Sequence, residues 1–137
     1  MKIDFKKLQE IGAFVGAPVE KTIKWTLTRE DGTTEDFEGV VYIRRNSCAT
    51  FERDIKAHMA GQEAAATKIS TNVCDENGNP ILTYEQALDL AEPLAAALLA
   101  AIIEVNAPKN SNPPTNSGTN SSSQASAGEQ SQKRNET

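Results

Sequence analysis

The stretch TIKWTLTREDGTTEDFEGVVYIRR, residues 22–45, decides the fold. Its first part places Ile23, Trp25 and Leu27 between Lys and Thr residues. Such an alternation of apolar and polar residues predicts a β-strand with one buried face. Residues 30–33 contain Asp-Gly, which is a strong signal for a hairpin turn. The chain is therefore expected to return over residues 34–45 as the second strand of an antiparallel hairpin.

The return strand carries apolar residues on both of its faces. Phe37, Val41 and Ile43 share one face, whereas Val40 and Tyr42 occupy the other. We therefore expect some cover on both sides of the middle of this strand. Helices are the obvious elements to supply that cover, and Trp25 and Tyr42 are expected to anchor the sheet.

Helical spacing appears before and after the hairpin. A short N-terminal helix is expected from apolar residues at mixed spacings: Ile3, Phe5, Leu8, Ile11 and Phe14. A second helix, over residues 48–68, is expected to cover the sheet and has these residues three or four apart: Phe51, Ile55, Met59 and Gln62. Gly61 is a weak point in this helix. Residues 69–74 alternate again, which predicts a short third strand.

A long apolar helix is expected over residues 84–105. Residues 83–86, Thr-Tyr-Glu-Gln, match a capping box that fixes its start. Pro93 lies inside this helix, so a kink is expected near residues 89–92. The charge-free run between Glu92 and Glu104 has roughly half of the about 20 apolar residues that a membrane span needs, so we expect no membrane insertion.

This helix is apolar over more than one face, which is typical of a central core helix or of a surface shared with another chain. We expect its apolar residues to include both core and partner-facing positions. The residues concerned are Leu90, Leu94, Leu98, Leu99, Ile102 and Ile103. The predicted fold class is α+β: an antiparallel hairpin or small sheet, covered by helices and closed by the long C-terminal helix.

The composition changes abruptly after Asn106. Residues 107–137 contain no Val, Ile, Leu, Met or aromatic residue, and a segment with nothing to bury does not offset its ordering entropy. We therefore predict a folded domain over residues 1–106 and a Ser/Asn/Pro-rich disordered tail over residues 107–137. The chain carries a net charge of -5, and the tail holds three basic and two acidic residues, which leaves -6 on the domain. An acidic domain does not favour nucleic-acid binding, so a protein partner is expected.

Residues able to carry catalysis are few. His58 is the only histidine, and the two cysteines, Cys48 and Cys74, have no CxxC spacing and no secretory signal. They are expected to be reduced thiols in a cytosol, although a disulfide between them stays open. A small enzyme that pairs one of these thiols with His58 also stays open as an alternative.

One loop partly matches a calcium-binding template. Asp75, Asn77 and Asn79 fit its first three ligand positions. The template then requires glycine where Pro80 stands and a bidentate Glu where Gln86 stands. The loop is therefore expected to be a turn that leads into the helix cap, and we expect no metal and no cofactor.

Short stretches along the chain carry a family resemblance. They are PVEKTIKW at 18–25, Asp-Gly at 31–32, VYIR at 41–44, CDENGNP at 74–80, LTYEQA at 82–87 and AIIEVN at 101–106. In this order they resemble the tail assembly chaperones of lambda-like long-tailed phages, the siphophages, over about residues 12–106. The residues after Asn106 depart from any pattern of that family.

The resemblance implies a non-enzymatic protein of the host cell cytoplasm. Such a chaperone binds the tape measure protein before tail tube subunits polymerise around it, and it is absent from the mature virion. In this family a ribosomal frameshift typically yields a longer form that recruits the tail tube protein. Self-association is also expected, because the helix surfaces are so apolar. Another small phage tail morphogenesis or completion protein, retained in the particle, stays open as an alternative.

Overall fold

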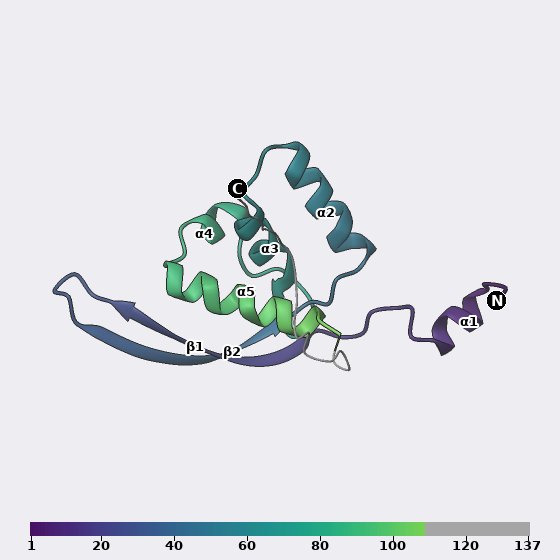
Figure 1. Cartoon of the computed structure of the whole chain (residues 1–137), viewed down its shortest axis with the longest axis horizontal. Helices are drawn as coiled ribbons and strands as arrows, with labels where there is room; N and C mark the ends of the chain where they lie inside the picture. The colour runs from purple at the N-terminus through teal and green to yellow at the C-terminus, as the bar shows by residue number, and fades with distance from the viewer. Residues whose placement is uncertain (109–137) are drawn as a thin grey trace, which may run out of the picture. The chain divides into compact units, whose positions relative to one another are not determined.

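The computed structural model describes residues 1–108 (Figure 1). Its elements are α1 (Phe5–Glu10), β1 (Val19–Thr28), β2 (Thr34–Ile43), α2 (Cys48–Met59), α3 (Ala64–Asn72), β3 (Val73–Cys74), α4 (Tyr84–Leu88) and α5 (Glu92–Asn106). The fold is α+β, as predicted. The predicted disordered tail, apart from Ala107 and Pro108, lies outside the described residues.

The predicted hairpin is confirmed and forms most of the sheet. β1 and β2 pair antiparallel with Trp25 opposite Phe37, and β3 adds to β2 with Cys74 opposite Tyr42. The turn is held by the Asp31 carboxylate, whose Oδ1 accepts hydrogen bonds from the Thr33 backbone N–H at 3.0 Å and from the Thr33 hydroxyl at 2.7 Å. Gly32 supplies the positive φ, +88°, that this turn needs.

One face of the sheet is covered by α5, which lies along the hairpin in Figure 1. The core joins the inner residues of both strands to one side of this helix. Its members from these elements include Ile23, Val41, Ile43, Leu98 and Ile102, and Ile69 of α3 packs with them. The other face is covered less than predicted, because Val40 is 58% exposed. Tyr42, next to the short β3, is half-buried.

Trp25 lies where it was expected to anchor the sheet, on the covered face. Its indole stacks on the Phe37 ring, with 5.7 Å between ring centroids, and it packs against the core. The indole reaches over Gly39, where a Cβ would lie 3.4 Å from the Trp25 ring. Toward the turn, the covered face of the hairpin is therefore occupied by an aromatic pair, which continues the aliphatic core.

The prediction of one long helix over residues 84–105 is wrong. The capping box is present, with the Thr83 hydroxyl accepting from Gln86 N and the Gln86 side chain accepting from Thr83 N. The helix that it starts, α4, ends at Leu88. Pro93 lies in the first turn of a separate helix, α5, where its missing N–H costs nothing. A proline that was expected to kink a helix thus begins a new one.

The predictions for residues 48–74 need two corrections. The expected single helix is broken at Gly61, whose φ of +75° and whose N–H bond to the His58 carbonyl end α2. The expected strand over residues 69–74 is reduced to Val73–Cys74, since residues up to Asn72 belong to α3. There Ile69 is buried in the core, so tertiary packing outweighs the local alternation.

Candidate partner-binding surface

The apolar stripe of α2 faces outward. Phe51, Ile55 and Met59 lie four residues apart, on one side of the helix, and they are 65%, 43% and 80% exposed. The side chains of α2 that are buried are instead Thr50 and Ala57. The prediction that this stripe covers the sheet is therefore wrong. We call the three exposed residues the α2 stripe.

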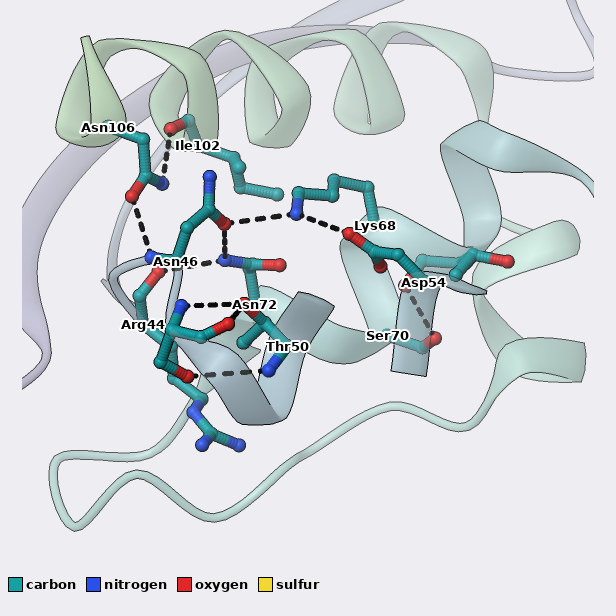
Figure 2. Close-up of polar contacts among 11 residues, drawn as sticks. Arg44, Asn46, Thr50, Asp54, Lys68, Ser70, Asn72, Ile102 and Asn106 are labelled. Carbon is teal, nitrogen blue, oxygen red and sulfur yellow. Dashed lines mark hydrogen bonds and ion pairs between the residues drawn. The ribbon is translucent and has the colours of Figure 1, made fainter. Parts of the chain in front are cut away.

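Polar contacts lie at the start of α2 and between α2 and α3. Ser47 and Thr50 form a reciprocal cap at its start, with Ser47 N donating to Thr50 Oγ1 at 2.8 Å. Further along, the Lys68 ammonium on α3 donates to Asp54 Oδ2 at 2.9 Å and to Asn46 Oδ1 at 3.0 Å (Figure 2). The bond between Asp54 and Lys68 joins α2 to α3, and the apolar side of α2 is left in solvent.

The same contacts reach the sheet and α5 through two asparagines. Asn72, which is fully buried, donates through Nδ2 to the Arg44 carbonyl at 2.9 Å and to Asn46 Oδ1 at 3.0 Å. The Asn46 backbone N–H donates to Asn106 Oδ1 at 2.7 Å (Figure 2). Segments far apart in sequence are thus joined by directional bonds close to the start of α2.

The structure separates the predicted partner-facing residues into three groups. Leu98 and Ile102 belong to the core, with 5% and 2% exposure. Leu90, Leu94 and Leu99 are half-buried and pack against the core. Ile103 is 66% exposed. Within the predicted set, Ile103 is therefore the residue that presents most of its side chain to solvent.

On α2, the two residues considered for the alternative enzyme site lie too far apart to act together. Cys48 and His58 lie ten residues apart on this helix, which separates them by about 15 Å. Cys74 is buried in β3, and its thiol lies 3.6 Å from the Tyr42 carbonyl. Burial raises the pKa of the Cys74 thiol, which lowers its thiolate fraction and hence its reactivity. Both cysteines are free thiols in the structure.

In the calcium-like loop, the Asp75 carboxylate accepts hydrogen bonds from the backbone of the loop itself. Asp75 Oδ1 accepts hydrogen bonds from the N–H groups of Asn77 at 2.8 Å and Asn79 at 2.9 Å. These bonds lower the pKa of the Asp75 carboxyl. Within residues 1–108 no group of three His, Cys, Asp or Glu side chains is placed to hold a metal ion. In the same part of the chain no helix has the length and apolar content to cross a membrane.

Comparison with known proteins supplies the family. A family model described as phage tail assembly chaperone, TAC, matches residues 6–106. The chain belongs to the phage tail assembly chaperone family. No curated protein and no solved structure matches it. The matched region of this chaperone includes both the α2 stripe and Ile103.

Membership confirms the resemblance and places the protein among the assembly chaperones, a non-enzymatic kind of protein that acts on tail components.

In this chaperone the outward direction of the α2 stripe was not predicted. The sequence did contain the polar cap, Ser47 with Thr50. The bond between Asp54 and Lys68, however, joins two helices whose mutual position the sequence pattern does not give.

Proposed function

We propose that this protein binds the tape measure protein during phage tail assembly and keeps its helices soluble until tail tube subunits polymerise around them. The observation that carries the proposal is the α2 stripe, an apolar helix face exposed in a member of a tail assembly chaperone family. A long helical protein with apolar stripes needs such faces to cover it before assembly.

The remaining parts of the proposal concern where the chaperone acts and which other proteins it binds. The chaperone acts in the host cell cytoplasm and is absent from the mature virion. A longer, frameshifted form brings the tail tube protein, and copies of the chaperone self-associate through apolar helix faces. The family membership supports this scheme, since the family is described as one of tail assembly chaperones.

Co-expression tests the proposal. The full chain is produced together with the tape measure protein encoded in the same genome, and solubility and co-purification are measured. We expect a soluble complex that does not form when an unrelated acidic domain replaces the chaperone. If the tape measure protein stays insoluble and nothing co-purifies, the proposed client is wrong. Finding the chain in purified virions would favour a completion protein instead.

Replacements on α5 test whether it also contributes a partner-facing residue. We expect Ile103→Lys to change the free energy of unfolding by less than about 0.5 kcal/mol, because Ile103 is exposed in the last turn, where a cation suits the helix dipole. The same variant is expected to weaken co-purification of the tape measure protein. Leu98→Lys, five residues earlier in the core, is expected to prevent folding. Undiminished co-purification by Ile103→Lys would remove α5 from the proposed surface.

A further inference from the structure

β1 is an edge strand whose outer side carries an unpaired backbone. The strands of the sheet follow the order β1-β2-β3, so within residues 1–108 only β2 pairs with β1. At the turn, the Arg29 N–H donates to the Thr33 carbonyl at 2.7 Å, and hydrogen-bonded pairs alternate along an antiparallel ladder. The odd-numbered residues of β1 therefore bond to β2, whereas the backbone groups of Glu20, Thr22 and Lys24 point away from the sheet.

The space beside this edge is open. A hollow of about 210 Å³ lies between residues 21–24 of β1 and one flank of α5. On the helix it is lined by three alanines and one glutamate: Ala97, Ala100, Ala101 and Glu104. Because the alanine side chains are small, they leave room beside β1 for a further strand, and they let a second helix approach α5 closely.

The lysines of β1 do not prevent such pairing. Lysine commonly protects an edge strand, because an added strand would have to bury its charge. Lys21, on the covered face, is already neutralised by Glu104, with 2.9 Å between Nζ and Oε2. Glu20 and Lys24 are exposed, and neither is in an ion pair in the described part of the chain. These two residues are therefore the charges that a partner strand has to match.

The two charges match each other in a second copy of the chain. When two β1 strands pair antiparallel about a two-fold axis at Thr22, Glu20 of each copy lies opposite Lys24 of the other. The outward backbone groups of these residues then face one another as hydrogen-bonded pairs. An axis at Glu20 or at Lys24 would set like charges opposite each other, and an axis at Ile23 would leave both charges unmatched. Charge therefore selects the register that is centred on Thr22.

We propose that two copies of this chain pair through their β1 edges, antiparallel and centred on Thr22. The pairing joins the two three-stranded sheets into one, with both α5 helices on the same face and their alanine flanks toward each other. The contact is made by β1 and not by the α2 stripe. The inference therefore goes beyond the proposed function and is tested without the tape measure protein.

Charge exchange between two variants tests the register. Analytical ultracentrifugation of the full wild-type chain is expected to show a monomer–dimer equilibrium. Glu20→Lys and Lys24→Glu are each expected to weaken the dimer at least about tenfold, because each variant sets two like-charged pairs across the contact. An equimolar mixture of the two variants is expected to dimerise again, since every lysine then lies opposite a glutamate. Association through apolar helix faces does not respond to this exchange.

Two results of that experiment would overturn the proposal. One is a wild-type chain that stays monomeric at about 1 mM, a concentration at which even a weak specific contact forms. The other is a mixture of the variants that associates no better than either variant alone.

A proline at position 22 tests the part played by the backbone. Thr22→Pro removes an N–H that points to solvent in the single chain, so the fold is expected to be kept. The dimer is expected to weaken at least about tenfold, because each copy loses a central hydrogen bond. Thr28→Pro is the matched control, since its N–H also points outward but lies beyond the paired residues, and it is expected to dimerise as the wild-type chain does. Urea unfolding, followed by Trp25 fluorescence, checks the fold of both variants. A folded Thr22→Pro chain that dimerises like the wild type would contradict pairing through β1, and if this variant does not fold, the charge exchange decides.

Discussion

Replacing Ile43 with alanine is expected to lower the free energy of unfolding by about 2–5 kcal/mol, the cost of deleting a large aliphatic side chain from a packed core. Ile43 is fully buried on β2, in the cluster that joins the sheet to α5 and α3. For a domain of this size such a loss is a large part of the total stability. Urea denaturation, followed by the fluorescence of Trp25, measures it.

The control for this variant is Val40→Ala, on the opposite face of the same strand. Val40 is 58% exposed, so its replacement is expected to change the free energy of unfolding by less than about 0.5 kcal/mol. Equal losses for the two variants would mean that both faces of β2 are covered, as the sequence pattern suggested, and that the observed one-sided core is wrong.

The double replacement of Phe51 and Met59 by serine is expected to abolish tape measure binding while the fold is kept. These side chains are 65% and 80% exposed, so they contribute little to the core. If a client helix buries them, each contributes about 1.5–3 kcal/mol, and losing both weakens binding by at least about 100-fold. Co-purification with the tape measure protein measures the loss, and circular dichroism checks the fold.

The control matches residue type and exposure. Phe5 in α1 is also 65% exposed, so Phe5→Ser removes an equally accessible ring from another element. We expect this variant to bind the tape measure protein as the wild-type chain does. If it loses binding while the double α2 variant retains it, the client surface lies on the N-terminal segment and not on α2.

The sequence predicts well those elements whose signals are local. The alternation around Trp25 and the Asp-Gly turn predict the hairpin, and the Thr83 capping box predicts the start of α4. These features depend on residues within a few positions of one another, so tertiary context does not change them. The family resemblance was likewise carried by short contiguous stretches and is confirmed.

The errors come from residues whose partners are distant in sequence. The stripe of Phe51, Ile55 and Met59 predicts an amphipathic helix, but it does not tell which side of that helix packs against the rest of the domain. In the structure the buried residues of α2 are Thr50 and Ala57, and Asp54 binds Lys68 on α3. Pro93 is consistent with either a kink or a helix start, and packing of α4 and α5 as separate helices settles it.

Photo-crosslinking from Cys48 tests the central claim, that the outer side of α2 contacts the tape measure protein. Of the two cysteines, Cys48 is exposed in the first turn of α2 and Cys74 is buried, so a thiol-reactive benzophenone labels Cys48 in the folded chain. We predict a light-dependent adduct with the co-expressed tape measure protein, and none from a benzophenone at position 40 in a Cys48→Ser, Val40→Cys variant. A complex that forms but crosslinks only from position 40 would contradict the account.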